Sequence, residues 1–299
     1  MSRRITLLVG VLLMLLTSAC GGSSTPMATI RVGSKEFTEQ LILGEMYALL
    51  LEEAGFKVER ELALGGSPAL QEALVTDQID LYPEYTGTGL VMVLKLPVNT
   101  DPQQVYETVA EGYRTTFNLV WLDPAPMNNT YVLVMTQQDS ARYGIKTISD
   151  MVAQASQLTM AGTVEFANRE DGLPGLKRVY GDFEFERYIP IEPDLKYRAL
   201  VEGEADVITG FGTDGQISAF NLAALEDDKQ MYPPYQVAPV VRQEIMDAHP
   251  EIRDVLNELA PLLTDETMRR LNNEVSSNKR EPADVAKEFL VQQGLIDAK

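Results

Sequence analysis

The chain has 299 residues, of which 45% are hydrophobic, and its net charge is −19 at neutral pH. This length suffices for two domains of ordinary size, and the hydrophobic content is that of a globular protein, which excludes a disordered acidic chain. The acidic balance opposes binding to nucleic acid and to anionic lipid headgroups. His249 and Cys20 are the only residues of their types, so a zinc or thiolate site and a Ser-His or Cys-His catalytic pair both lack enough members. We expect no metal and no cofactor.

The first 19 residues are predicted to be a signal peptide. Arg3 and Arg4 precede residues 5–16, which are almost wholly apolar. A helix of twelve residues rises only ~18 Å, well short of the ~30 Å hydrocarbon core, so this segment is an export signal and not a stable span. Its removal leaves 280 residues, with 23 basic against 44 acidic side chains and a net charge of −21.

Cys20 is predicted to carry the membrane anchor. The small residues Thr17, Ser18 and Ala19 precede it, and a Gly/Ser/Thr-rich tether over residues 20–27 follows it. This arrangement resembles a bacterial lipoprotein signal, in which the cysteine thiol is acylated and becomes the new N-terminus. The alternative is a free cysteine behind an ordinary cleavable signal, because the only cysteine of the chain can form no internal disulfide.

The first unit after the tether alternates strands and helices. Residues 28–33 are strand-like, and Thr38 is expected to cap a helix that ends near Gly55. Residues 58–64 alternate like a strand, and a second helix opens at Gly65-Gly66-Ser67-Pro68 with Ser67 as its cap. Residues 79–82 are a strand that leads into the loop PEYTGTG. This β-α-β-α-β order predicts an α/β sheet with ligand contacts at the ends of its strands.

A second unit begins after Asn128-Asn129. Strands are expected over residues 131–136, 158–164 and 205–211, with a helix over 149–155. After Tyr232-Pro233-Pro234-Tyr235 the chain returns to a strand at Val237 and then to amphipathic helices. The proline-rich stretches at 123–126 and 232–235 are natural crossing points between two lobes. We therefore predict one discontinuous lobe over 28–128 plus 236–299 and a second lobe over 129–235.

Five segments of the mature chain stand out as motifs. They are Gly33-Ser34-Lys35-Glu36-Phe37-Thr38-Glu39-Gln40, Asp80-Leu81-Tyr82-Pro83-Glu84-Tyr85-Thr86-Gly87-Thr88-Gly89, Glu165-Phe166-Ala167-Asn168-Arg169, Phe211-Gly212-Thr213-Asp214 and Tyr232-Pro233-Pro234-Tyr235. Together they resemble the substrate-binding proteins of ABC importers for glycine betaine, choline, carnitine and related osmoprotectants. The resemblance covers essentially the whole mature chain and implies a two-lobed, periplasmic-binding-protein-like fold of type II, each lobe a mixed sheet flanked by helices, with the ligand in the cleft.

The resemblance implies an aromatic box formed by Tyr85, Tyr131, Phe211 and Tyr235. A quaternary ammonium group has no N–H to donate and spreads its charge over methyl groups, so stacked aromatic faces bind it by cation–π attraction. Each ring contributes on the order of 0.5–2 kcal/mol, and several rings are therefore needed. Phe211 stands where tyrosine is common in the family, which keeps the π face and removes a hydroxyl.

The resemblance further implies that Lys35, Thr88 and Arg169 bind a ligand carboxylate. Lys35 and Arg169 fall in different lobes, so a ligand that touches both favours closure. For Arg169, a surface ion pair with the neighbouring Glu170 or Asp171 is the alternative. Glu84 is a candidate partner for a cation, with a position on the loop surface or at a lobe contact as the equal alternative.

Asp214 is expected to brace its own loop, because an acid beside the ligand carboxylate would repel it.

The predicted function is the capture of a quaternary-ammonium compatible solute by a monomeric, extracytoplasmic lipoprotein, which delivers it to an ABC permease. Two alternatives stay open: the same fold with an ergothioneine-like or amino-acid-like ligand, and a surface hydrolase that uses acidic residues.

Overall fold

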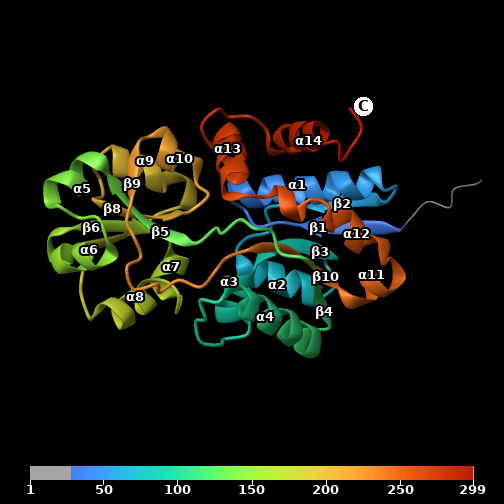
Figure 1. The fold of residues 1–299 in the computed structure, drawn as a ribbon, viewed down its shortest axis with the longest axis horizontal. Helices are drawn as coiled ribbons and strands as arrows, with labels where there is room; N and C mark the ends of the chain where they lie inside the picture. Colours follow the sequence, from blue (N-terminus) through green and yellow to red (C-terminus); the bar gives the residue numbers. More distant parts are fainter. Residues whose placement is uncertain (1–27, 299) are drawn as a thin grey trace, which may run out of the picture.

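The computed structural model describes residues 28–298 and consists of two lobes, each built on a five-stranded mixed sheet with helices on both faces (Figure 1). The predicted two-lobed α/β architecture is confirmed. The predicted signal peptide, Cys20 and the tether lie outside the described residues. Within residues 28–298, none of the helices has the length and apolarity that crossing a membrane requires.

The sheet of the first lobe has the strand order β2-β1-β3-β10-β4. Strand β1 runs parallel to β2 and β3, whereas β10 runs antiparallel to β3 and β4. Strand β10 follows the whole second lobe in sequence, so the first lobe is assembled from two separate stretches of chain. The strands are β1 (Thr29–Gly33), β2 (Lys57–Glu61), β3 (Leu81–Tyr85), β4 (Leu119–Trp121) and β10 (Val237–Arg242).

Helices of the first lobe cover its sheet from both sides. In Figure 1, α1 and the C-terminal helices α13 and α14 lie above the sheet, and α2 and α4 lie below it. The upper layer buries the apolar side of α1, including Ile42, Met46 and Leu50, which are at most 3% exposed. The helices are α1 (Thr38–Glu53), α2 (Ser67–Val75), α3 (Thr86–Thr88), the π-helical turn η1 (Gly89–Val93), α4 (Pro102–Phe117), α11 (Gln243–Ala248), α12 (Glu251–Asn257), the 3₁₀ turn η4 (Ala260–Leu262), α13 (Asp265–Ser276) and α14 (Pro282–Gln293).

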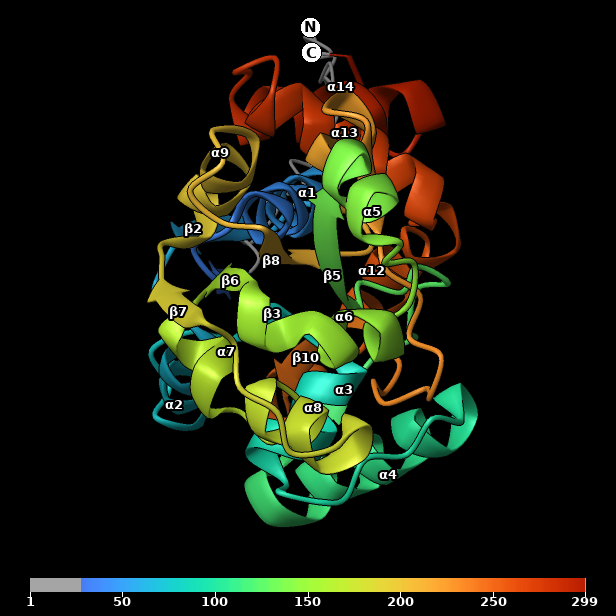
Figure 2. The same ribbon diagram turned by 90° about the vertical axis from the view of Figure 1, so that its left-hand side faces the viewer.

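The second lobe, which faces the viewer in Figure 2, has the strand order β7-β6-β8-β5-β9. Strand β6 is parallel to β7 and β8, and β5 is antiparallel to β8 and β9. The strands are β5 (Tyr131–Thr136), β6 (Thr159–Gly162), β7 (Arg187–Pro190), β8 (Val207–Phe211) and β9 (Leu222–Ala224). The helices are α5 (Gln137–Tyr143), α6 (Ile148–Gln154), η2 (Ala155–Gln157), α7 (Val164–Asn168), α8 (Leu173–Tyr180), η3 (Pro193–Leu195), α9 (Lys196–Val201) and α10 (Gly215–Ala219).

Two segments cross between the lobes, and they are hydrogen-bonded to each other. The amide of Asn129 donates to the carbonyl of Tyr235 at 3.1 Å, and the amide of Tyr235 donates to Oδ1 of Asn128 at 2.8 Å. Helix α13 provides a further contact between the lobes, because Nε of Arg269 donates to the carbonyl of Gly212 at 2.9 Å. The crossing point therefore holds Tyr235 in a defined position at the boundary of the lobes.

The two helix caps expected from the sequence are wrong. Phe37 occupies the N-cap position of α1 and Gly66 that of α2, and neither helix start has a side-chain cap hydrogen bond. Thr38 and Ser67 are instead the first residues inside these helices. In the first turn of α1, Oε1 of Gln40 accepts from the amide of Lys35 at 3.3 Å, which ties the segment before the helix to its start.

The segment PEYTGTG is not a loop. Pro83, Glu84 and Tyr85 continue β3, and the following residues form the helical turns α3 and η1. A proline usually argues against a central strand because it donates no hydrogen bond to the ladder. Here Pro83 faces Pro239 of β10 in the antiparallel register, so both missing donors fall at one position of the ladder.

Candidate functional site

A cavity of about 90 Å³ lies between the two lobes. The structure brings together all seven residues that the sequence analysis selected, and all of them line this cavity. They are Lys35, Tyr85, Thr88, Tyr131, Arg169, Phe211 and Tyr235. Phe37, Asn129, Glu165 and Lys196 line the same cavity and were not predicted as ligand contacts. The cavity is the candidate ligand site.

The aromatic residues of the site stand at strand ends. Tyr85 is the last residue of β3, Tyr131 the first of β5 and Phe211 the last of β8. Because β5 and β8 are antiparallel, Tyr131 lies directly opposite Phe211 in the ladder. Tyr235 comes two residues before Val237, which pairs with Tyr85 across β3 and β10. Strand register thus places the four predicted walls of the box around one space, as expected of ligand contacts in α/β sheets.

Five rings follow one another around the cavity. The centroid of Tyr131 lies 5.0 Å from that of Phe211 and 6.0 Å from that of Tyr235, to which it is nearly perpendicular at 83°. Phe37 joins the other side, stacked 5.9 Å from Phe211 and 6.3 Å from Tyr85. Phe37 belongs to the motif around Lys35, so its place in that motif was the signal that could have identified it.

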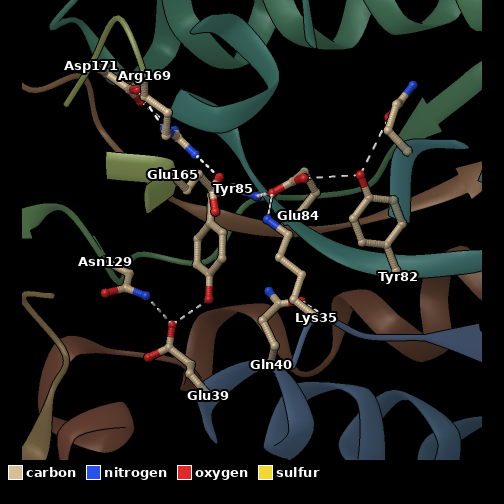
Figure 3. A network of polar contacts seen from close by, with 11 residues as sticks. Lys35, Glu39, Gln40, Tyr82, Glu84, Tyr85, Asn129, Glu165, Arg169 and Asp171 are labelled. Atoms are coloured by element: carbon tan, nitrogen blue, oxygen red, sulfur yellow. Dashed lines mark hydrogen bonds and ion pairs between the residues drawn. The ribbon is translucent and has the colours of Figure 1, made fainter. Parts of the chain in front are cut away.

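The hydroxyl groups of two wall tyrosines point away from the cavity towards buried carboxylates. The hydroxyl of Tyr85 donates to Oε1 of Glu39 at 2.7 Å (Figure 3), and that of Tyr235 donates to Oδ2 of Asp171. Burial raises the pKa of both phenols well above the ordinary value of 10, so they stay protonated donors at neutral pH. Both rings are thereby held by their hydroxyl ends.

Lys35 forms a buried ion pair inside the site. Its Nζ donates to Oε1 of Glu84 at 2.6 Å, and the same ammonium lies 5.1 Å from the centroid of the Tyr85 ring (Figure 3). Glu84 is completely buried in β3. The alternative of a surface position for Glu84 is therefore wrong. Its carboxylate pairs with Lys35, a cation of the protein itself, and a contact with a ligand cation stays a prediction.

Arg169 is also held by acids, but not at the surface. Its Nε and Nη2 donate to the two oxygens of buried Asp171 at 2.7 and 2.5 Å, and Nη1 donates to Glu165 at 2.9 Å. Its guanidinium lies 5.7 Å from the centroid of the Tyr131 ring. The surface ion pair considered for Arg169 is wrong in position, because Asp171 is fully buried and Glu170 pairs with Arg178 instead.

A third cation, Lys196, was missed because no motif surrounds it. Its Nζ lies 4.5 Å from the centroid of Phe211 and 3.1 Å from Oδ2 of Asp214. The same carboxylate oxygen accepts the hydroxyl of Tyr197 at 2.7 Å and the amide of Phe211 at 3.0 Å. Asp214 thus braces the loop after β8, which confirms its predicted role.

Glu39 is a buried acid that the sequence motifs did not identify as part of the site. It is 3% exposed, and it accepts hydrogen bonds from the hydroxyl of Tyr85 at 2.7 Å and from the side-chain amides of Asn129 and Asn272, both at 2.8 Å. Burial raises its pKa above the ordinary value, and Asp214 adds to the shift through like-charge repulsion. Its partners come from distant parts of the chain, so no local pattern marks it.

Thr88 lines the cavity from α3, directly after a glycine that the packing requires. A Cβ on Gly87 would come within 2.8 Å of two atoms of the Tyr235 ring and 2.9 Å from the carbonyl oxygen of Pro234. The TGTG sequence thus lets the backbone of α3 approach Tyr235 closely enough to seat its ring in the box.

The chemistry of the lining residues indicates what kind of ligand the site suits. Within residues 28–298, no group of three or more His, Cys, Asp or Glu side chains is arranged to hold a metal ion. The buried acids are engaged by cations or hydrogen-bond donors, and five aromatic rings line the cavity. This combination suits a small solute with a delocalised positive charge.

Gly87→Ala tests the close approach to Tyr235. Overpacking of this kind costs about 1–3 kcal/mol, so the free energy of unfolding, measured with urea, should fall by that amount. Gly66→Ala is the control at the same cavity, because its Cβ meets its nearest neighbour, Oε2 of Glu165, at an ordinary 3.6 Å. Gly66 is the N-cap of α2, so only the smaller loss from a poorer N-cap residue is expected there. Equal losses in the two variants would contradict the steric requirement at Gly87.

Glu39→Gln tests the cost of the buried carboxylate through its pH dependence. Because the pKa is raised in the folded state, the contribution of Glu39 to stability is fully present below pH 4.5, its ordinary value, and is lost as the pH rises through the folded-state pKa. The free energy of unfolding of the wild type, relative to the variant, should therefore fall from pH 4.5 towards neutrality in urea titrations. A difference that stays constant over this range would contradict the burial of an ionisable Glu39.

Comparison with known proteins agrees with this geometry. A family model described as the substrate binding domain of ABC-type glycine betaine transport system matches residues 28–292. A solved structure described as a glycine betaine/carnitine/choline ABC transporter superposes with a TM-score of 0.75 at 31% identity, covering 90% of this chain and all of that one.

Relatives of known name are similar over most of this chain. It is 34% identical to the carnitine transport binding protein OpuCC of Listeria monocytogenes over the full length of both proteins. It is 34% identical to a glycine-betaine-binding protein of Pseudomonas aeruginosa, covering 90% of this chain and 89% of that protein. It is also 36% identical to the ergothioneine transport permease/ergothioneine binding protein EgtU of Helicobacter pylori, of which it spans 47%.

These matches confirm the predicted family and the expectation of a solute-binding protein in place of an enzyme. The chain belongs to the family of substrate-binding domains of ABC-type glycine betaine transport systems.

Proposed function

We propose that this protein is an extracytoplasmic lipoprotein that captures a quaternary-ammonium compatible solute, such as glycine betaine, choline or carnitine, and delivers it to an ABC permease. The observation that carries the proposal is the sequence of five rings around one cavity, Tyr85, Phe37, Phe211, Tyr131 and Tyr235. The names of the relatives support this ligand class, since they include binding proteins for carnitine and for glycine betaine.

The rings would bind the cationic end of the ligand. Cation–π attraction contributes on the order of 0.5–2 kcal/mol per ring and is strongest where water is excluded. Tyr85, Tyr131 and Tyr235 are each at most 8% exposed, so a trimethylammonium group among them would be largely removed from water. A group with N–H donors would also need acceptors on the wall, which the ring faces do not supply.

Lys35, Arg169 and Thr88 would bind a carboxylate at the other end of the ligand. One proton of the Lys35 ammonium is directed at Glu84, which leaves two for a ligand oxygen. Arg169 already donates from Nε, Nη1 and Nη2 to Asp171 and Glu165, so only two of its five N–H groups are available. The ligand carboxylate would share these cations with the protein's own acids.

Contacts from both lobes would couple binding to closure. Lys35 and Tyr85 belong to the first sheet, whereas Tyr131 and Phe211 belong to the second. A ligand that touches both sets binds the closed arrangement better than an open one and shifts the population towards it. The two crossing segments next to Tyr235 are the place for the hinge, with the lobe boundaries at 128/129 and 235/236.

Calorimetric titration of the mature protein with glycine betaine, choline and carnitine tests the ligand class. We expect a saturable heat and a rise in Tm with at least one of them. In Tyr85→Ala combined with Tyr235→Ala, the loss of two rings should weaken binding by about tenfold to a thousandfold, from ~0.5–2 kcal/mol per ring. Binding of ergothioneine alone, or of an amino acid that survives the double substitution, would favour the alternative ligand class.

The lipid anchor is tested at the N-terminus of the protein from the membrane fraction. Mass spectrometry should find Cys20 as the first residue with an acylated mass. Cys20→Ser should release the protein from the membrane without changing its affinity for the ligand. An unmodified first residue downstream of a cleaved signal would establish a secreted protein in place of a lipoprotein.

A further inference from the structure

Four buried or half-buried acids stand around the cavity, and three of them are paired with a cation. Glu84 pairs with Lys35, Asp171 with Arg169, and Asp214 with Lys196. Glu165 is a second acid on Arg169, but its side chain is 41% exposed, so water and salt screen its charge. Each buried pair cancels its own charge to a first approximation. A preference that comes from buried charge therefore needs a group outside these pairs.

Glu39 is that group. Its carboxylate is buried behind Tyr85, where its partners are a phenol and two neutral amides. Among residues 28–298 no basic side chain forms an ion pair with it. A buried charge without a counter-ion is costly, and a cation that arrives nearby compensates it.

Tyr85 connects this charge to the cavity. Its hydroxyl donates to Glu39 (Figure 3), and its ring lines the cavity. When a phenol donates a hydrogen bond to a carboxylate, electron density shifts from its hydroxyl group into its ring. The negative charge of the carboxylate adds to this effect, and both make the face of the ring more attractive to a cation. Glu39 also lines a second space of about 40 Å³. This space borders the main cavity, because both are lined by Phe37, Asn129, Pro193, Lys196 and Phe211.

We propose that Glu39 is the specificity-determining residue that makes the box prefer a cation over a neutral group of the same shape, and that it acts through Tyr85. The ligand's ammonium group supplies the counter-charge that the protein does not provide. This inference rests on the proposed function and adds to it the residue that selects the ligand's charge.

Matched ligands separate charge from shape. Choline and glycine betaine are each compared with the tert-butyl analogue in which carbon replaces the quaternary nitrogen. Glu39→Gln should weaken the binding of the two cationic ligands by about tenfold, which is ~1.4 kcal/mol, and should leave binding of the analogues unchanged. Glu39→Asp keeps the charge on a shorter side chain and should recover part of the loss. Tyr85→Phe should also lower the ratio of affinities between each cationic ligand and its analogue. Adding Glu39→Gln to Tyr85→Phe should change this ratio little further.

Asp227→Asn is the control, because it alters a tyrosine–carboxylate hydrogen bond of the same kind, from Tyr180, outside the cavity. It should leave all affinities at the wild-type level. The inference is overturned if Glu39→Gln binds choline and glycine betaine as tightly as the wild type does. It is also overturned if the substitution weakens binding of the analogues by the same factor as binding of the cationic ligands. A wild type that binds none of these ligands would instead contradict the proposed function.

Discussion

Buried charge is the constraint on which this site depends. Lys35, Arg169 and Lys196 all lie at the boundary of the lobes with little exposure to water, and an isolated ion in such a place would lose several kcal/mol of hydration. Each therefore requires a carboxylate, and the fold supplies one in each case. The rings then pack against these neutralised pairs, so that each of the three cations also lies over an aromatic face.

The fold satisfies this constraint by bringing together chain segments that are far apart in sequence. Lys35 and Glu84 are 49 residues apart and meet because β1 and β3 are parallel neighbours that end at the same edge of the sheet. Asp171 of the second lobe meets Tyr235 of the crossing segment, 64 residues away. The polar network therefore extends from the first sheet across the crossing point into the second lobe. A change of lobe angle would alter the distances between these partners, which ties ligand binding to the relative position of the lobes.

Sequence motifs predicted the surface of the cavity better than the structure behind it. The seven residues selected for ligand contact all line the cavity. Three of them, Tyr85, Tyr131 and Phe211, are strand-end residues, whose position is set as soon as the strands pair. Phe37, Glu39 and Lys196 were missed. Glu39 is recognisable only through Tyr85, Asn129 and Asn272, which lie 46, 90 and 233 residues away.

The predicted helix caps were wrong for a related reason. Phe37 holds the N-cap position of α1 while its ring packs on Tyr85 and Phe211, so tertiary packing overrode the local preference for a polar cap.

The loss of a hydroxyl at Phe211 fits the same requirement that buried polar groups be satisfied. Tyr85 and Tyr235 each need a buried acceptor for their hydroxyl groups, and Glu39 and Asp171 provide them. Around Phe211 the nearby carboxylate is already used, because Asp214 accepts from Tyr197 and from the amide of Phe211 and pairs with Lys196. A phenylalanine presents the same ring face to the cavity without a further donor that needs a partner. Phe211 therefore differs from its neighbours in what stands behind the ring and not in the surface that it offers to a cation.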